Sequence, residues 1–366
     1  MEFINLKKQQ EILKDELDSR ISNVLSHGQY IMGPEIKELE SKLCEYTESE
    51  YCITVSSGTE ALLISLMALE IGIGDEIITT PFTFVSTAEV IALLGAKPVF
   101  VDIDPQSCNL DPTGIESSIS DKTKAIMPVS LYGQPADMDQ INEIAAKHHL
   151  PVIEDAAQSF GSVQDKRKSC NLSTIGCTSF FPSKPLGCYG DGGAIFTNSP
   201  EIAEAARAIR VHGQKERYIF SSIGVGGRMD TLQAAVVLAK LTIFDKEVEL
   251  RHEIGEKYNK IFDQLGIDRV KQKSNTSSVF AQYTIFIEER EKVVKSLNRD
   301  GIPTSIHYPL PLNQQPAYKD LCSNETPISS NISKTVLSLP MGPYLTKTEQ
   351  EKVVKSLEVS LKNETV

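Results

Sequence analysis

Lys184 is the residue whose surroundings most strongly favour chemistry in this 366-residue sequence. It lies between Pro182 and Pro185, and glycines follow at positions 187, 190, 192 and 193. A lysine held between an apolar strand and a glycine-rich return is expected to be partly desolvated, which lowers its pKa and leaves a neutral amine. A neutral amine is what forms a Schiff base with an aldehyde. Ser179, on the preceding segment, offers a hydroxyl for a phosphate.

Asp155 follows a short apolar segment, residues 151–154, and precedes Gln158. Ligands of open α/β sheets bind beyond the carboxyl ends of the strands, so the Asp155 carboxylate is expected to point into a binding crevice. The alternative interpretation is a plain helix N-cap, which is a common role for aspartate.

A third segment, SSGTEAL at residues 56–62, follows a predicted strand and opens a predicted helix. The free backbone N–H groups and the helix dipole of such a turn bind anions. Gly58 permits close approach of a ligand and Thr59 adds a hydroxyl, whereas the alternative interpretation is an ordinary Ser/Thr N-cap. Phe84 follows another predicted strand and is either a stacking platform or part of the core.

A phosphate cup, an acid for a pyridinium nitrogen, an aromatic face and an amine for an aldehyde are together the requirements of pyridoxal 5′-phosphate. In this interpretation Lys184 binds the aldehyde and Asp155 keeps the ring nitrogen protonated. Gln158 hydrogen-bonds the phenolic oxygen, and Phe84 provides the aromatic face. The phosphate is held by three small residues: Gly58, Thr59 and Ser179.

The elements that must position these residues alternate between strand and helix from residue 50 to residue 200. Strands are predicted at residues 51–55, 76–80, 98–101, 125–129 and 151–154, and helices at 59–69, 85–94 and 141–148. This alternation is typical of βαβ units and a mostly parallel sheet that is covered on both faces. Two further strands, 177–181 and 194–197, have too short a connection for a crossover helix, so one of them is expected to run antiparallel.

Helical patterns flank this region. An N-terminal helical arm is predicted at residues 9–25, and a second helix from Glu35 to about Tyr46. After Asp230, residues 231–240 continue into 243–265 as a long helix, either straight or kinked. A strand at 279–287, a helix at 289–298, a strand at 304–307 and a helix at 347–361 follow. The predicted fold class is α/β, with a large cofactor-binding domain at residues 1–250 and a smaller α+β domain at 251–366.

Charge and composition exclude several classes of function. The chain has 37 Lys and Arg against 49 Asp and Glu, a net charge of −12, which argues against nucleic-acid binding. No window has the length of a membrane span, and no apolar run of a signal peptide follows the N-terminus. No CxxC or zinc-type spacing occurs, so no metal site is expected. We expect reduced thiols in a cytoplasmic protein at all seven cysteines: Cys44, Cys52, Cys108, Cys170, Cys177, Cys188 and Cys322.

The sequence resembles the DegT/DnrJ/EryC1/StrS sugar aminotransferases over nearly its whole length. The matching stretches, in family order, are GQYIMGPEI (28–36), SSGTEAL (56–62), PFTFVSTAE (81–89), PVFVDID (98–104), VIEDAAQSFG (152–161), SFFPSKPLGCYGDGGAI (179–195), GGRMDTLQAA (226–235) and SIHYPLPL (305–312). This resemblance implies the fold-type I architecture of aspartate aminotransferase. It also implies pyridoxal 5′-phosphate as the cofactor and, at the matching positions, the cofactor-binding roles given above.

The resemblance further implies amino transfer from L-glutamate, which leaves as 2-oxoglutarate, to a UDP-linked keto-sugar. EFINLKKQQ (2–10), residues 170–198 and HYPLPLN (307–313) are especially similar to family members that act on UDP-2-acetamido-2-deoxy-3-oxo-glucuronate for bacterial surface polysaccharide (LPS O-antigen). Alternative acceptors are UDP- or dTDP-linked 4-keto-6-deoxy or 3-keto-6-deoxy sugars.

The resemblance also implies a homodimer with shared active sites, to which GQYIMGPEI, including Tyr30, and Arg228 are contributed by the partner subunit. Tyr30, Arg228, His307 and Tyr308 are candidates for substrate contacts. For Arg228 the alternative interpretation is a surface or intersubunit salt bridge. For His307 and Tyr308 it is a simple turn at the end of a strand.

One position departs from the family pattern. The family has an asparagine in a G-x-N-x-R stretch that is donated across the dimer to the cofactor phosphate, and this chain has Gly226 there. One phosphate hydrogen bond is therefore expected to be missing, or to be replaced by a backbone N–H or water.

Two rival functions share this fold. Relatives that dehydrate a sugar replace the Schiff-base lysine by histidine, so Lys184 favours transamination. A non-catalytic regulator usually carries an appended DNA-binding domain, and an acidic chain of this length has neither the room nor the basic patch for one.

Overall fold

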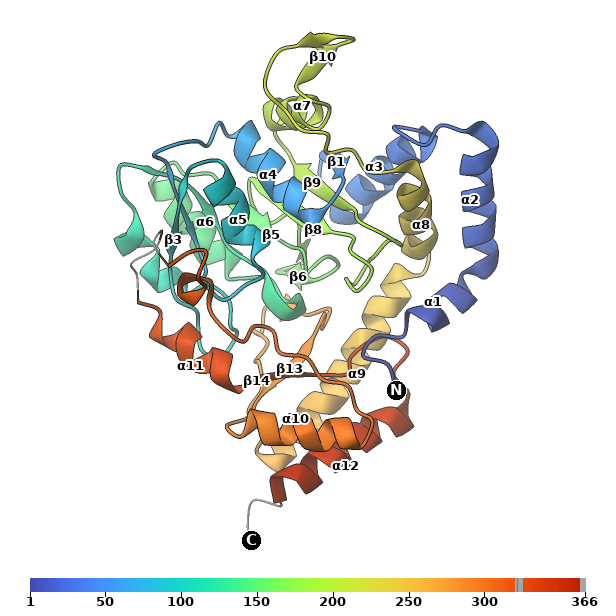
Figure 1. Ribbon diagram of the computed structural model, residues 1–366, viewed down its shortest axis with the longest axis vertical. Coiled ribbons are helices and arrows are strands. Elements are labelled where there is room, and N and C mark those ends of the chain that lie inside the picture. Colours follow the sequence, from blue (N-terminus) through green and yellow to red (C-terminus); the bar gives the residue numbers. More distant parts are fainter. Residues whose placement is uncertain (320, 322–324, 363–366) are drawn as a thin grey trace.

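The centre of the molecule is a sheet with the strand order β3-β2-β4-β5-β8-β9-β1 (Figure 1). The computed structural model describes residues 1–319, 321 and 325–362. Parallel bridges from Ile126 to Val152 and from Val129 to Asp155 join β4 to β5, so two ladders form one sheet. The strands are β1 (Tyr51–Val55), β2 (Glu76–Thr79), β3 (Lys97–Phe100), β4 (Thr123–Met127), β5 (Ile153–Asp155), β8 (Ile175–Ser179) and β9 (Gly193–Thr197).

The predicted α/β class and mostly parallel sheet are confirmed. Among the described strands of this sheet, β9 alone runs antiparallel to its neighbours β8 and β1. This is the outcome that the short connection between residues 181 and 194 predicted, because a chain that returns without a crossover must reverse its direction.

Helices cover both faces of the sheet, which explains the apolar character of its strands. One core joins α4, α5 and α7 to strand residues such as Ile53 and Ile195. Another joins α2, α3 and α8 to Phe196 on the opposite face. The helices of this part are α1 (Leu6–Ile12), α2 (Lys14–His27), α3 (Pro34–Thr47), α4 (Gly58–Ala68), α5 (Ser86–Leu93), α6 (Met138–Lys147), α7 (Pro200–Ile209) and α8 (Thr231–Leu241).

The C-terminal part has a core of its own, below the sheet in Figure 1. Tyr258, Ile285 and Leu337 belong to it, and two antiparallel strands form its small sheet. Its elements are α9 (Phe244–Leu265), β13 (Tyr283–Phe286), α10 (Arg290–Arg299), α11 (Pro327–Thr335), β14 (Val336–Leu339) and α12 (Lys347–Lys362). The domain boundary near residue 250 stays a prediction, since α9 runs without a break across that position.

Several sequence expectations were wrong in detail. Residues 304–307 do not form a strand: Ser305 makes a single bridge to Ser338, and the chain then turns into a cavity. The N-terminal helix of 9–25 is two helices that meet at Leu13, and the bend lets Gln9 Nε2 reach both carboxylate oxygens of buried Glu247 at 2.8 and 2.9 Å.

The predicted kink between α8 and α9 is present at residues 242–243.

Other elements were not predicted, because they are short or lie between stronger patterns. They are α7, α11 and β14, the short strands β6 (Val163–Gln164), β7 (Arg167–Lys168), β10 (Gln214–Glu216), β11 (Ile219–Phe220) and β12 (Thr276–Ser277), and the 3₁₀ turns Pro112–Gly114, Glu116–Ser118, Leu131–Gly133 and Leu312–Gln314.

Six cysteines are free thiols, and Cys322 lies outside the described residues. None of the helices formed by the described residues has both the length and the apolar character that a bilayer crossing requires.

Candidate active site

A cavity of about 490 Å³ lies where β5 and β8 end and where the loops after β1 and β2 begin. The structure brings most of the predicted site residues together around it, although their roles stay predictions. The predicted residues in its wall are Gly58, Thr59, Phe84, Asp155, Gln158, Ser179, Lys184, His307 and Tyr308.

Lys184 lies on the tight loop between β8 and β9. Its backbone N–H donates to Phe181 O at 2.9 Å, and Cys188 N donates to Phe180 O at 2.7 Å, which folds the loop back on itself. Gly187 is required in this return, because a Cβ there would lie 2.6 Å from Phe181 O. Burial lowers the pKa of the Lys184 amine, and the negative charge of Asp155 opposes this shift. The loop therefore presents a lysine with increased neutral-amine character to the cavity, as the sequence predicted.

Asp155 is the last residue of β5 and is buried. Its Oδ2 accepts a hydrogen bond from Thr87 Oγ1 at 2.8 Å, and its Oδ1 accepts one from Ala157 N at 3.2 Å. Burial raises the pKa of the Asp155 carboxyl, while these two donors and Lys184 act in the opposite direction. Because a donor holds each oxygen in place, the carboxylate has a fixed orientation from which it can pair with a cationic group.

The N-terminus of α4 forms the cup that the sequence predicted for an anion. Ser57 caps the helix by accepting from Glu60 N at 3.0 Å, and Thr59 Oγ1 lies 2.7 Å from Ser86 Oγ. A Cβ at Gly58 would lie 2.7 Å from Ser179 Cβ, so only glycine lets β8 approach the helix end this closely. The N–H groups of the first turn and the hydroxyls of Thr59 and Ser86 therefore fit a phosphate group.

Gln158 and Tyr308 connect the sheet to the C-terminal part across the cavity. Gln158 Oε1 accepts from Tyr132 N at 3.0 Å, and its Nε2 donates to the Tyr308 hydroxyl at 3.1 Å. The Tyr308 ring lies between Phe82 and Phe84, with centroid distances of 6.2 and 6.5 Å. Burial raises the pKa of Tyr308, so its hydroxyl stays protonated at neutral pH.

His307 is held by hydroxyl groups at both ring nitrogens. Nδ1 lies 2.9 Å from Ser338 Oγ and Nε2 lies 3.2 Å from Ser305 Oγ, while the His307 carbonyl accepts from the Tyr132 hydroxyl. Burial and the nearby Lys184 lower the pKa of His307 to about 4. The imidazole is therefore neutral near pH 7, which suits it to shape the wall rather than to carry charge.

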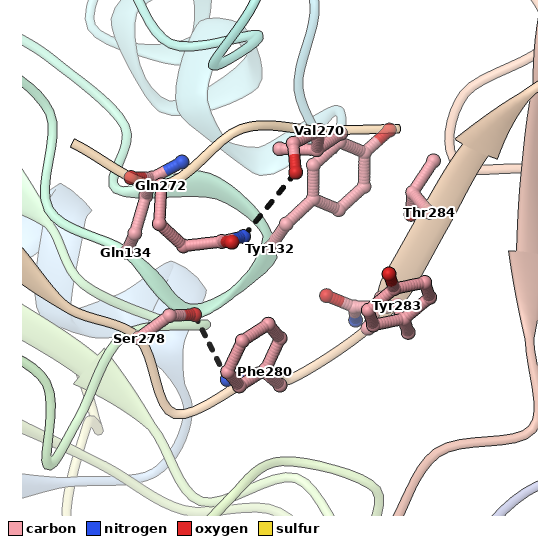
Figure 2. Close-up of a pocket in the computed structure, with 9 residues that line it drawn as sticks. Tyr132, Gln134, Val270, Gln272, Ser278, Phe280, Tyr283 and Thr284 are labelled. Atoms are coloured by element: carbon pink, nitrogen blue, oxygen red, sulfur yellow. Dashed lines mark hydrogen bonds between the residues drawn. The ribbon is translucent and has the colours of Figure 1, made fainter. Parts of the chain in front are cut away.

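A second, much smaller cavity of about 10 Å³ adjoins the main one (Figure 2). In Figure 2 the ring of Tyr132, a residue of the part that contains the large sheet, lies near Val270 and Thr284 of the C-terminal part. Gln282 lines both this small cavity and the main one.

Tyr30 and Arg228 are not among the residues that line the main cavity of the same chain. Tyr30 is exposed and its carbonyl accepts from Thr231 N at 3.0 Å. Arg228 is half-buried on a segment whose Gly227 carbonyl accepts from Ser56 N at 2.9 Å. The space that a side chain at Gly226 would need is bordered by His212, whose Nε2 would lie 3.3 Å from a Cβ there.

Sequence reasoning missed residues that line the cavity and residues that hold its lining in place. Thr87 holds Asp155, Tyr132 holds both Gln158 and the His307 carbonyl, and Asp191 and Gln282 line the cavity. Thr87 lies within the stretch 81–89, whose match to the family was a usable signal. Asp191 lies within another matching stretch, 179–195, whereas Tyr132 and Gln282 carry no local pattern that points to a site.

The arrangement fits pyridoxal 5′-phosphate, a phosphate-bearing aldehyde with a basic ring nitrogen. The α4 cup would hold the phosphate, Phe84 and the wall beside it the ring, and the fixed Asp155 carboxylate the protonated nitrogen. Lys184 would supply the amine for the aldehyde. A parallel sheet with this combination at its strand ends is the architecture of a pyridoxal-phosphate-dependent aminotransferase.

Comparison with known proteins establishes the family. The model of the DegT/DnrJ/EryC1/StrS aminotransferase family matches residues 11–358, so the chain belongs to this family, whose members are pyridoxal-phosphate-dependent sugar aminotransferases. It is 55% identical over 345 residues to the UDP-2-acetamido-2-deoxy-3-oxo-D-glucuronate aminotransferase of Pseudomonas aeruginosa, a match that covers 94% of this chain and 96% of that protein.

Two further relatives are similar to this chain over nearly its whole length. A pleiotropic regulatory protein of Geobacillus stearothermophilus is 42% identical over 97% of both chains. The crystal structure of NtdA from Bacillus subtilis with bound cofactor PMP superposes with a TM-score of 0.91 at 30% identity and covers 99% of this chain and 85% of that one. The fold-type I architecture and the pyridoxal-phosphate cofactor are thereby confirmed.

Proposed function

We propose that this chain transfers the amino group of L-glutamate to UDP-2-acetamido-2-deoxy-3-oxo-glucuronate, which gives a 3-amino uronate for bacterial surface polysaccharide. The observation that carries the proposal is the single cavity bordered by Lys184, Asp155 and the α4 cup, in a chain with 55% identity to an aminotransferase of that name. The free thiols and the nucleotide-linked acceptor favour a cytoplasmic enzyme.

The side chains of the cavity have distinct tasks in such a reaction. The bound cofactor supplies an electron sink for the bond that breaks at the substrate carbon. Lys184 Nζ, as a neutral amine, would take the proton from the glutamate carbon that bears the amino group and, in the second half of the reaction, would deliver a proton to the sugar carbon that receives the amine. Asp155, fixed by Thr87, keeps the proton on the ring nitrogen. Because glutamate and the keto-sugar use the same cavity in turn, we expect ping-pong kinetics.

Amination of a panel of acceptors tests the proposal. The cofactor-loaded protein is given L-glutamate with UDP-linked 3-oxo-glucuronate or with UDP- and dTDP-linked 4-keto-6-deoxy sugars, and products are identified by mass spectrometry. We expect the 3-amino uronate to form together with 2-oxoglutarate. Faster turnover of a 4-keto-6-deoxy sugar would replace the proposed acceptor, and a cofactor spectrum that does not respond to glutamate would favour a regulatory function instead.

A homodimer with shared active sites is the second part of the proposal, and the charge of the cavity supports it. Among the described lining residues, Lys184 is the cation, and Asp155 and Asp191 are acidic. A cofactor phosphate, a UDP group and a uronate need more positive charge than this, and Arg228 lies outside the cavity of its own chain. The β10–β11 hairpin projects from the body (Figure 1) and exposes apolar side chains that a second copy could bury: Tyr218, Ile219, Phe220 and Ile223.

Mixing an inactive variant with one of weakened acceptor binding, assayed at low acceptor concentration, tests whether sites are shared. If Lys184 and Arg228 serve the same site from different subunits, Lys184→Ala and Arg228→Ala proteins should regain activity after they exchange subunits, because one site per mixed dimer is intact. Light scattering gives the oligomeric state. Full activity in a monomer at micromolar concentration, or mixtures that gain no activity despite exchange, would refute sharing.

A further inference from the structure

Gln282 has a feature that the reaction as described does not use. Its side-chain carbonyl oxygen, Oε1, is buried and has no hydrogen-bond partner among the described residues, although the residue lines the active-site cavity. A buried acceptor without a partner costs about 1–3 kcal/mol, so such an atom calls for an explanation, for example a bound water or a ligand. A ligand that brings a donor to Oε1 would remove this cost.

The backbone that carries Gln282 is fixed from both sides. Val279 N donates to Gly133 O at 2.8 Å, and Arg251 donates from its guanidinium to Phe280 O at 3.3 Å. The Gly133 backbone approaches so closely that a Cβ there would lie 2.6 Å from Ala281 N. The backbone just before Gln282 is therefore held in place at the start of β13.

The neighbours of Gln282 place it on the wall that also presents His307. Gln282 and Thr284 both line the small cavity, and Gln282 and His307 both line the main one. Thr284 Oγ1 lies 2.9 Å from Ser338 Oγ, which in turn lies 2.9 Å from His307 Nδ1. The small cavity, which Gln282 also lines, measures only about 10 Å³, room for about one water. A larger partner must come from the active-site cavity.

We propose that Gln282 Oε1 accepts a hydrogen bond from the N–H of the 2-acetamido group of the acceptor sugar and thereby selects 2-acetamido sugars. This inference rests on the proposed function. The acetamido N–H can only donate, and it is attached to the carbon next to the reacting ketone, so it is buried wherever the ketone is. Gln282 Oε1 can only accept. On this wall Gln158 Oε1 and both His307 nitrogens already have partners, whereas Gln282 Oε1 has none among the described residues.

A protein–ligand cycle tests the contact with ligands that bind without reacting. Calorimetry compares UDP-2-acetamido-2-deoxy-glucuronate with UDP-2-deoxy-glucuronate, which has no donor at C2, on the cofactor-loaded wild type and on Gln282→Met. We expect the variant to bind the acetamido ligand about tenfold more weakly, which corresponds to about 1.4 kcal/mol, and the 2-deoxy ligand within about twofold. The spectral change with glutamate should keep its rate.

Gln272→Met is the matched control, because Gln272 lines the small cavity but not the active site. It should leave both affinities unchanged. Equal weakening of both ligands, no weakening of either, or an equally slowed glutamate reaction would each overturn the role of Gln282. If the wild type reacts with glutamate but binds neither ligand, the proposed acceptor is wrong, a result that differs from every outcome that concerns Gln282 alone.

Discussion

The hydrogen bond from Thr87 to Asp155 gives the sharpest test of the site's electrostatics. Thr87→Val keeps the shape of the side chain but removes the Oγ1 donor that lies 2.8 Å from Asp155 Oδ2. Both residues are buried, so the carboxylate cannot replace this bond freely with water. A hydrogen bond to a charged group contributes about 1.5–3 kcal/mol. At an unfolding entropy of about 2.1 cal/mol/K per residue, this lowers the Tm of the apo protein by about 2–4 °C at pH 7.

The loss of stability in Thr87→Val should depend on pH. Burial raises the pKa of Asp155 above its usual value of 3.8, so the folded state holds the proton more tightly than the unfolded state does. The contribution of Asp155 to stability is therefore largest at low pH, and it falls as the pH rises through the pKa that Asp155 has in the folded state. Loss of the Thr87 donor raises the pKa of Asp155 further. The Tm deficit of Thr87→Val should consequently be full at pH 7 and should shrink towards pH 4, where the protonated carboxyl no longer needs the donor as strongly.

Calorimetric unfolding of the apo protein between pH 7 and pH 4 provides the measurement. Thr83→Val is the control: Thr83 Oγ1 lies 3.2 Å from Thr87 Oγ1, so this variant removes a neutral hydrogen bond from the same chain of contacts. Its deficit should not depend on pH. If both variants show the same deficit at every pH, the carboxylate of Asp155 is not what Thr87 stabilises, and the reasoning fails.

Four other substitutions test the site. Lys184→Ala should abolish amino transfer and the absorbance of the lysine-bound cofactor without changing the circular dichroism spectrum; near-wild-type turnover would contradict its role. Gly58→Ala places a Cβ 2.7 Å from Ser179 Cβ, and this overpacking should weaken cofactor binding by about 1–3 kcal/mol, whereas Gly72→Ala, with nothing within 4 Å, should not. Arg228→Ala should raise KM for the keto-uronate, with a loss of about 1.5–3 kcal/mol in binding free energy, and should leave KM for glutamate nearly unchanged. Equal effects on both KM values would indicate a structural role. Because the pKa of His307 is lowered to about 4 from 6.5, folding loses stability as the pH falls through this interval; His307→Asn should remove that loss, and an NMR titration of His307 near 6.5 would disprove it.

The large part of the chain could be predicted because its signals are local. Runs of β-branched residues bounded by glycine and proline located β1 to β5 to within a few residues. The turn at residues 56–59 and the loop around Lys184 carry their chemistry in consecutive residues, so both could be recognised before their neighbours were known.

The contacts that complete the site could not be predicted, because they join residues far apart in the sequence. Thr87 and Asp155 are 68 positions apart, and Gln158 and Tyr308 are 150 positions apart. The strand predicted at 304–307 failed for a related reason: Thr304 and Ile306 have strand propensity, but only Ser305 finds a partner. Strand propensity indicates that a residue fits a sheet, whereas pairing decides whether one forms.

Strand β14, which the sequence did not reveal, determines how the acceptor side of the cavity is built. Its Ser338 hydroxyl contacts both Thr284 and His307, and its backbone pairs with Ser305. The cofactor cup thus depends on local motifs of the large part, while the wall with Gln282 and His307 depends on the pairing of β13 with β14. Because β13 and β14 carry none of the residues assigned to the cofactor, we expect substitutions along these two strands to alter the choice of sugar more than the glutamate reaction.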